Sequence, residues 1–157
     1  MTIELQKATM ADAEEIHACQ VAAFQPLLFK YQDTDSNPAN EPLARTITRI
    51  NRTDGGFYKI MKDNKVFVGA ICLFTKEPGI YWISPMFVYP SFQGKGYAQE
   101  TLKQVEIIFA DAKAWRLATI EEEQGNCYLY EKAGYQRTGK SQVLNARATL
   151  VYYEKRM

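Results

Sequence analysis

The sequence predicts a mixed α/β fold in which one central sheet carries helices on both faces. Stretches with apolar residues at alternate positions, typical of strands, are interspersed with stretches whose apolar residues recur at helical spacing. The predicted order is strand, helix, helix, three strands, helix, strand, helix and two strands, without a repeat or a low-complexity tract. At 157 residues the chain has the usual length of one domain, so we expect a single domain over residues 1–157.

The composition argues against several classes of partner. Lys and Arg total 19 against 18 Asp and Glu, which offers no net basic surface to nucleic acid or to an anionic membrane. No apolar run is long enough to span a bilayer and residues 1–5 lack an export pattern, so we expect a cytoplasmic protein. Cys19, Cys72 and Cys127 are scattered, and they form no metal motif with the single histidine, His17.

The first part of the chain is predicted to form an edge strand and two helices. Residues 3–7 alternate apolar and polar side chains. A capping-box pair then precedes an apolar pattern that predicts a helix over residues 11–24. Residues 25–41 are rich in Pro, Asp and Asn and are expected to be irregular, and a second helix is predicted over residues 41–51.

The middle of the chain has the two-residue period of strands. Residues 57–62 and 66–76 flank Asp63 and Asn64, a pair suited to positive φ, and they are predicted to form a β-hairpin. Residues 80–88 are rich in β-branched and aromatic side chains, as a buried strand should be. These three segments are expected to form a meander.

A long helix and a final group of strands complete the predicted order. Apolar residues at helical spacing predict a helix that begins near Gly96. The remaining predicted elements are a strand over residues 115–120, a short helix over 126–132 and a terminal hairpin of 135–143 and 149–154.

The run between the buried strand and the long helix has the composition of an anion site. Gly94 and Gly96 lack a Cβ atom, so the backbone can turn sharply and the first amides of the helix can face a ligand. The helix dipole places roughly half a positive charge there and Lys95 adds a full one, which favours a pyrophosphate. The alternative is that the two glycines only turn and cap the loop. Neither GxxxxGK[ST] nor GxGxxG with an acid about twenty residues later is present, so a Walker loop and a dinucleotide site are not expected.

Two motifs carry a resemblance to a known family. Residues 93–98 read QxxGxA and are preceded by Val88 and Pro90 as VxP. Residues 129–135 read LYEKAGY, in which Gly134 suits a helix C-cap. In this order the motifs resemble the GCN5-related N-acetyltransferase (GNAT) family, and the resemblance covers nearly the whole chain. It implies the acyl-CoA N-acyltransferase fold of that family, with a mostly antiparallel central sheet.

The resemblance implies an enzyme that moves an acetyl group from acetyl-CoA directly to a primary amine. The acceptor would be a small molecule or a peptide, and acetyl-CoA would be the cosubstrate. No metal, nucleic acid or membrane is expected to take part, and a homodimer is compatible with this prediction. One alternative is a non-catalytic regulatory module that binds CoA, and another is an interaction domain in which both glycine motifs are architectural.

The resemblance also assigns residues to cofactor binding. Backbone groups of Met86, Phe87 and Val88 would pair with the pantetheine arm as an added strand does. Asn126 would contact the cofactor, whereas relatives carry their asparagine at the position that Glu123 holds here. The pyrophosphate would be held by the loop and the first helical turn, comprising Gln93, Gly94, Lys95, Gly96, Tyr97, Ala98 and Gln99.

Tyr130 and Glu121 are the candidate catalytic residues. A primary amine with a pKa of about 10.4 is mostly protonated at neutral pH, so its deprotonation is the main obstacle. A phenol with a pKa of about 10 is neutral there and can protonate the leaving thiolate, which is the role expected for Tyr130. Glu121, with Glu122 beside it, follows a predicted strand and is the nearest acidic candidate for the base. The alternative for both glutamates is a solvated acidic loop.

Acceptor choice is expected to depend on residues 24–40 and on the terminal hairpin, because loops vary over a constant scaffold. Asp33, Asp35 and Glu41 could attract a cationic amine, and they could equally be ordinary surface charges.

Overall fold

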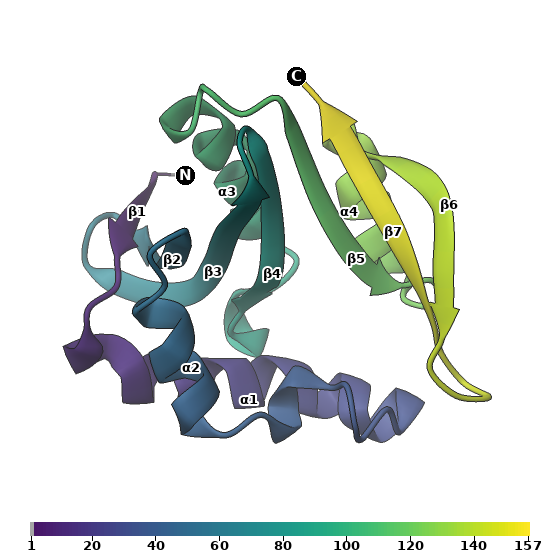
Figure 1. Ribbon diagram of the computed structural model, residues 1–157. Helices are drawn as coiled ribbons and strands as arrows, with labels where there is room; N and C mark the ends of the chain where they lie inside the picture. Colours follow the sequence, from purple (N-terminus) through teal and green to yellow (C-terminus); the bar gives the residue numbers. More distant parts are fainter. Residues whose placement is uncertain (1) are drawn as a thin grey trace.

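The computed structural model describes residues 2–157 and contains a seven-stranded sheet with helices on both faces (Figure 1). In sheet order the strands are β1 (Ile3–Lys7), β2 (Gly55–Lys62), β3 (Val66–Glu77), β4 (Ile80–Val88), β5 (Ala114–Ile120), β7 (Thr149–Arg156) and β6 (Gln136–Val143). Neighbouring strands are antiparallel, except that β4 and β5 run parallel. The predicted mixed α/β fold with a mostly antiparallel sheet is therefore confirmed.

The helices divide between the two faces of the sheet. They are α1 (Ala13–Tyr31), α2 (Leu43–Ile50), α3 (Tyr97–Ile108) and α4 (Gln124–Lys132). α1 and α2 pack on β2 to β4 through a core that includes Ile16 and Phe87. α3 and α4 pack on the opposite face through a core that includes Leu102, Trp115 and Tyr153. No helix within residues 2–157 is long and apolar enough to cross a membrane.

The predicted elements agree with the structure except at the end of the first helix. The turn residues Asp63 and Asn64 have the expected positive φ, 52° and 59°. α1, however, continues through Pro26 to Tyr31, so the prediction that the chain becomes irregular at residue 25 is wrong. Proline removes one amide from the helical ladder but does not end a helix whose later residues are anchored. Tyr31 supplies that anchor, because only 3% of its surface is exposed.

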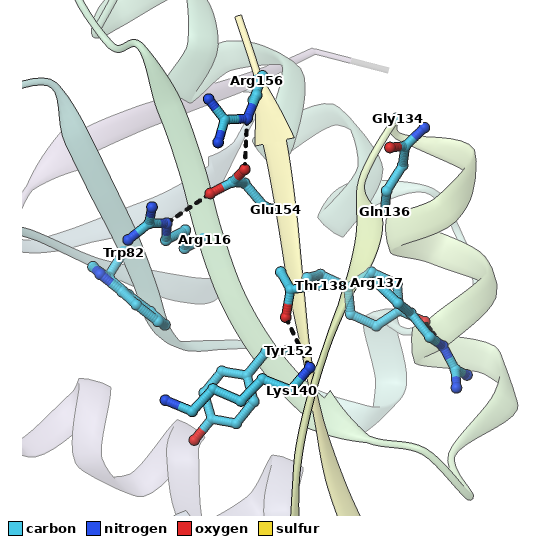
Figure 2. Close-up of a pocket in the computed structure, with 11 residues that line it drawn as sticks. Trp82, Arg116, Gly134, Gln136, Arg137, Thr138, Lys140, Tyr152, Glu154 and Arg156 are labelled. Atoms are coloured by element: carbon cyan, nitrogen blue, oxygen red, sulfur yellow. Dashed lines mark hydrogen bonds and ion pairs between the residues drawn. The ribbon is translucent and has the colours of Figure 1, made fainter.

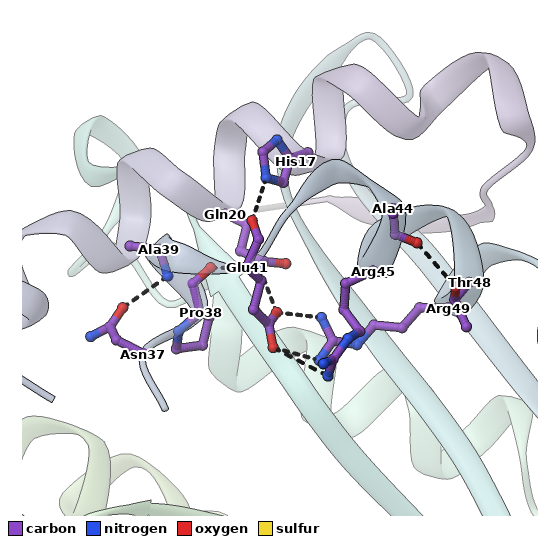
Figure 3. A network of polar contacts seen from close by, with 10 residues as sticks. All are labelled: His17, Gln20, Asn37, Pro38, Ala39, Glu41, Ala44, Arg45, Thr48 and Arg49. Atoms are coloured by element: carbon purple, nitrogen blue, oxygen red, sulfur yellow. Dashed lines mark hydrogen bonds and ion pairs between the residues drawn. The ribbon is translucent and has the colours of Figure 1, made fainter. Parts of the chain in front are cut away.

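A half-buried carboxylate holds the segment between α1 and α2 (Figure 3). Glu41 accepts hydrogen bonds from Arg49 at 2.6 and 3.0 Å and from Nε2 of Gln20 at 2.8 Å. Its backbone carbonyl oxygen lies 2.8 Å from Nε2 of His17. Burial alone would raise the pKa of Glu41, but the bonds from Arg49 and Gln20 lower it below its ordinary value, so this carboxylate is charged. Glu41 therefore joins α1 to α2.

β4 and β5 pair over only a short length and then separate (Figure 1). Their ladder joins residues 80–82 to residues 114–116. Beyond it, β4 continues to Val88 and is paired with β3 along its other edge. The edge of β4 that faces β5 thus presents backbone groups that β5 does not bond.

Gly69 of β3 allows β4 to approach closely at this separated end. A Cβ atom at position 69 would collide with the carbonyl oxygen of Phe87 and lie 2.9 Å from Cα of Val88. Because these are backbone atoms that cannot rotate away, we expect Gly69→Ala to lower the free energy of unfolding by roughly 1–3 kcal/mol. Urea denaturation followed by circular dichroism measures this change.

Gly125 of α4 provides the matched control for that experiment. A Cβ atom there meets nothing within 4 Å, and alanine is favoured over glycine inside a helix by about 1 kcal/mol. Gly125→Ala should leave stability unchanged or raise it. An equal loss of stability in the two variants would show that close packing at Gly69 is not the cause.

Candidate functional site

The run between β4 and α3 forms a sharp turn at its two glycines. After a short 3-10 turn, η3 (Pro90–Phe92), Gly94 and Gly96 have φ values of 74° and 88°. Gly96 is the N-cap residue of α3, so the first amides of that helix follow it directly. Nε2 of Gln93 donates to the carbonyl oxygen of Val88 at 2.9 Å and ties the turn to the end of β4. Such a helix entrance is suited to an anion.

A cavity of about 570 Å³ joins this turn to α1, β4 and α4. Its wall contains most of the residues that the sequence singles out: Met86, Phe87, Val88, Gln93, Gly94, Gly96, Tyr97, Ala98, Gln99, Asn126 and Tyr130. Two motifs that lie far apart in the sequence therefore face one space. The second half of α1 completes the wall with Ala23, Phe24, Pro26 and Leu27.

Two of the predicted site residues do not belong to this wall. Lys95 is exposed, and its amino group lies 5.7 Å from the centroid of the Phe92 ring. Glu121 is directed to Arg137 of β6, whose Nη1 donates to it at 2.6 Å. The structure thus brings together the backbone of the turn, the end of β4 and Tyr130, but it does not bring Glu121 to them.

Tyr130 is held in place by neighbouring aromatic rings. The side chain is 9% exposed, and its ring centroid lies 6.0 Å from that of Tyr135 and 6.2 Å from that of Tyr153. Burial, and secondarily the thiol of Cys127, raises the pKa of Tyr130 to about 12. The phenol therefore keeps its proton over the ordinary pH range. It can donate a hydrogen bond, or the proton itself, to a group in the cavity.

Three consecutive glutamates after β5 point in three directions. Glu121 forms the ion pair with Arg137. Glu122 accepts a hydrogen bond at 2.8 Å from the backbone amide of the first residue of β7. Glu123 lines the cavity and accepts a hydrogen bond at 2.8 Å from the hydroxyl of Tyr31. Only the third of these carboxylates is placed to meet a ligand.

Glu123 is a functional candidate to which sequence reasoning gave no role. It is the N-cap residue of α4, yet its side chain does not cap that helix. The carboxylate turns instead toward α1, where Oε2 also lies 3.6 Å from Nζ of Lys30, and 23% of the side chain is exposed. Within residues 2–157 it is the one acidic side chain of the cavity wall. The available signal was its position, two helical turns before Tyr130.

The other acidic residues considered for acceptor binding lie elsewhere. Asp33 is 6% exposed and accepts a hydrogen bond from Nδ2 of Asn37 at 3.0 Å. Glu41 is bound to Arg49, and neither these two carboxylates nor Asp35 contributes to the cavity wall. The end of α1 contributes instead through its contact with Glu123.

The end of α1 is fastened to the terminal hairpin as well as to α4. Nδ2 of Asn145, in the loop between β6 and β7, donates to the carbonyl oxygens of Tyr31 and Gln32 at 2.9 and 3.2 Å. The bond from Tyr31 to Glu123 completes this contact. Three segments that are distant in the sequence therefore meet beside the cavity.

Comparisons with known proteins agree with this arrangement. The family model described as the acetyltransferase (GNAT) family matches residues 21–135. No curated protein matches the chain significantly. Solved structures with the same fold include the PaiA N-acetyltransferase from Thermoplasma acidophilum in complex with coenzyme A, which is 17% identical, with 100% of both chains covered and a TM-score of 0.77.

Two further structures share the fold over nearly their whole length. The spermidine N-acetyltransferase from Vibrio cholerae, in complex with CoA and spermine, is 15% identical, with 97% of this chain and 94% of that chain covered and a TM-score of 0.75. The acetyl transferase from Salmonella typhimurium that modifies the N-terminal serine of ribosomal protein L7/L12 is 17% identical, with 100% and 96% covered and a TM-score of 0.75. Because the family match spans most of the sequence and includes both motifs, the chain belongs to the acetyltransferase (GNAT) family.

Proposed function

We propose that this protein transfers the acetyl group of acetyl-CoA directly to a primary amine of a small molecule or a peptide. The observation that carries the proposal is that both motifs line one cavity, with the turn at Gly94 and Gly96 at its end and Tyr130 in its wall. Family membership supports acetyl transfer, and the geometry supplies a place for each part of the cosubstrate.

The cofactor is proposed to bind along the separated edge of β4. Backbone groups of Met86, Phe87 and Val88 on that edge are available to the amides of the pantetheine arm, as in the addition of a strand to a sheet. The diphosphate lies at the entrance of α3, where the amides after Gly96 and the positive end of the helix dipole favour negative charge. Asn126 supplies a further polar contact from α4.

The proposed chemistry is a single transfer between two bound reactants. The amine nitrogen attacks the thioester carbon, the C–N bond forms, and the C–S bond breaks with its electron pair leaving on sulfur. Tyr130 gives its proton to the sulfur, and Glu123 accepts the proton that the nitrogen loses as it becomes cationic. Water returns the proton from Glu123 to Tyr130, so atoms and charge balance. We assign the base to Glu123 and not to Glu121 because Glu123 alone of the two lines the cavity.

Structures that share the fold act on different primary amines. One is named as a spermidine N-acetyltransferase, and another modifies the N-terminal serine of a ribosomal protein. Both acceptors are compatible with the reaction proposed here, since the chemistry at the thioester is the same for each.

Removal of the phenol tests the proposed acid. In a thiol-release assay against a panel of amines, Tyr130→Phe should lower kcat by roughly 100-fold, because the leaving thiolate loses its proton donor. The affinity for CoA should change little. Tight CoA binding by the wild-type protein without turnover of any amine would instead favour a regulatory module.

The pH profile and a neighbouring tyrosine serve as controls for this experiment. Burial raises the pKa of Tyr130 to about 12, so wild-type kcat/KM should rise with pH as the amine loses its proton and should not fall before about pH 10. Tyr135→Phe removes a buried hydroxyl that has no hydrogen-bond partner within residues 2–157, and it should leave kcat unchanged. A descending limb near pH 9 that vanishes in Tyr130→Phe would contradict the assignment.

The three glutamates allow the base to be tested within one short segment. Glu123→Gln should reduce kcat/KM by about 100-fold, because the amide cannot take the proton from nitrogen. Glu121→Gln breaks only an exposed ion pair and should change stability by less than about 1 kcal/mol with activity retained. If steady-state kinetics showed a larger loss of kcat/KM for Glu121→Gln than for Glu123→Gln, Glu121 would be the general base.

Two of the exposed glycines with positive φ, Gly94 and Gly139, separate ligand binding from backbone strain. Gly94 and Gly139 have φ values of 74° and 91°, and a Cβ atom at either position meets nothing within 4 Å. Alanine at each should therefore cost a similar 1–2 kcal/mol or so of stability. In calorimetric titrations Gly94→Ala should raise the Kd for CoA by about tenfold, because its methyl group occupies the phosphate approach. Gly139→Ala should leave the Kd for CoA unchanged. An equal rise in Kd for the two variants would show that the diphosphate does not bind at this turn.

A further inference from the structure

A second hollow lies on the part of the sheet that α1 and α2 do not cover. It has a volume of about 590 Å³ and extends over β4, β5, β7 and β6 (Figure 2). Side chains alternate between the two faces of a strand. Arg116, Tyr152 and Glu154 therefore point away from the core that contains Trp115 and Tyr153, and they line this hollow. We name it the basic groove and define it by Trp82, Arg116, Lys140, Tyr152, Glu154 and Arg156.

The basic groove carries more positive than negative charge. Glu154 accepts a hydrogen bond from Nε of Arg116 at 2.8 Å and forms an ion pair with Nε of Arg156 at 2.9 Å (Figure 2). The hydrogen bond from Arg116, and secondarily the charge of Arg156, lower the pKa of Glu154 below its ordinary value, so its carboxylate is charged. Lys140 adds a third cation. The charged groups that define the groove therefore comprise three cations and one carboxylate.

The donors of the basic groove are largely unoccupied. Each arginine contacts Glu154 through Nε, and in the part of the chain that the structure describes the terminal guanidinium nitrogens have no hydrogen-bond partner. Lys140 has its amino group 4.6 Å from the centroid of the Tyr152 ring. Arg137 also borders the hollow, but its guanidinium points away from it (Figure 2). Its Nη1 donates a hydrogen bond to Glu121. Planar guanidinium groups with free donors are suited to carboxylates.

Aromatic rings form one side of the groove. The rings of Trp82 and Tyr152 meet edge to face with their centroids 6.4 Å apart. Phe74 is paired with Trp82 across β3 and β4, and the two rings are nearly parallel, with their centroids 6.4 Å apart and an interplanar angle of 7°. A rigid aromatic surface beside unpaired cations offers packing for a peptide backbone and charge for acidic side chains.

The basic groove begins where β4 and β5 separate. Trp82 and Arg116 form the last pair of the parallel ladder. Met86, where the pantetheine arm is proposed to bind, follows Trp82 along the same strand. At about 3.3 Å per residue, the step from position 82 to position 86 covers roughly 13 Å. About four extended residues of a peptide span this distance.

We infer that the basic groove binds acidic side chains of the acceptor, and that the acceptor is a peptide with Asp or Glu within about five residues of its N-terminal amine. The inference rests on the proposed function and specifies its substrate class. The amine end meets Glu123 in the cavity, while the acidic end meets Arg116, Lys140 and Arg156. A polyamine would satisfy the first contact and would be repelled at the second.

Matched peptides test this assignment in the intact protein. The set consists of three peptides of equal length with a free N-terminal amine, together with spermidine. The second to fifth residues are Asp and Glu in the acidic peptide, Asn and Gln in the amide peptide, and Lys in the third. We expect the acidic peptide to have a KM lower than the amide peptide by roughly tenfold, with similar kcat and with a KM that rises with salt. Equal KM values for acidic and amide peptides, or a lower KM for spermidine, would overturn the inference.

Charge-removing variants locate the effect on the protein. The double variant Lys140→Gln with Arg156→Gln should raise the KM for the acidic peptide by roughly five- to tenfold and leave that for the amide peptide unchanged. Lys103→Gln, an exposed lysine on α3 outside the groove, is the control for loss of charge. An equal effect of the control would show that the groove is not the binding surface.

A binding measurement separates failure of the groove from failure of the catalytic proposal. Tryptophan fluorescence, which includes Trp82, should change on titration with the acidic peptide and should not change with the Lys peptide. If no amine is acetylated, this titration still decides the inference, because the double variant should abolish the signal. A response to ATP without a response to the acidic peptide would assign the groove to another anion and exclude the acceptor.

Discussion

The separation of β4 from β5 is the constraint on which the rest of the site depends. Buried backbone N–H and C=O groups need hydrogen-bond partners, and two parallel strands that diverge leave such groups without them. β4 cannot move toward β5, because its other edge is paired with β3 at a point where Gly69 brings the two backbones close. β5 in turn is paired along its length with β7. The opening is thus fixed from both sides, and a ligand with its own amides can complete the ladder.

Local physical chemistry explains why much of this arrangement could be predicted from the sequence. The turn at Gly94 and Gly96 follows from two residues without a Cβ atom between a strand pattern and a helix pattern, and such a signal needs no tertiary contact. Placing Tyr130 opposite that turn required the family resemblance. The first helix was misjudged at Pro26 because the residue that stabilises its continuation, Tyr31, does so through burial and a bond to Glu123, neither of which a local pattern contains.

Long-range contacts also decide which carboxylate faces the ligand. Glu121, Glu122 and Glu123 are chemically identical and adjacent, so no propensity distinguishes them. Their directions are set by an arginine of β6, an amide of β7 and a tyrosine of α1. The basic groove has the same origin, since Arg116 and Glu154 face one another only through the register of β5 with β7. A nearly balanced sequence, with 19 basic and 18 acidic residues, gives no sign of this local excess of positive charge.

Charge is thereby divided between the two sides of the opening. The cavity wall holds one carboxylate, Glu123, one lysine, Lys132, and a phenol whose raised pKa keeps it neutral. Glu123 is the group of this wall that attracts a positively charged amine. The basic groove carries an excess of positive charge. About four residues of extended chain separate it from Met86, where the pantetheine arm is proposed to bind. Because charge complementarity contributes more to the choice and orientation of a partner than to affinity, this division would orient the proposed acceptor, a peptide that has an amine at one end and acids behind it. A ligand that carries charge of one sign only can pair with Glu123 or with the basic groove, but not with both. The choice between ligands therefore needs no change in the scaffold that binds the cofactor.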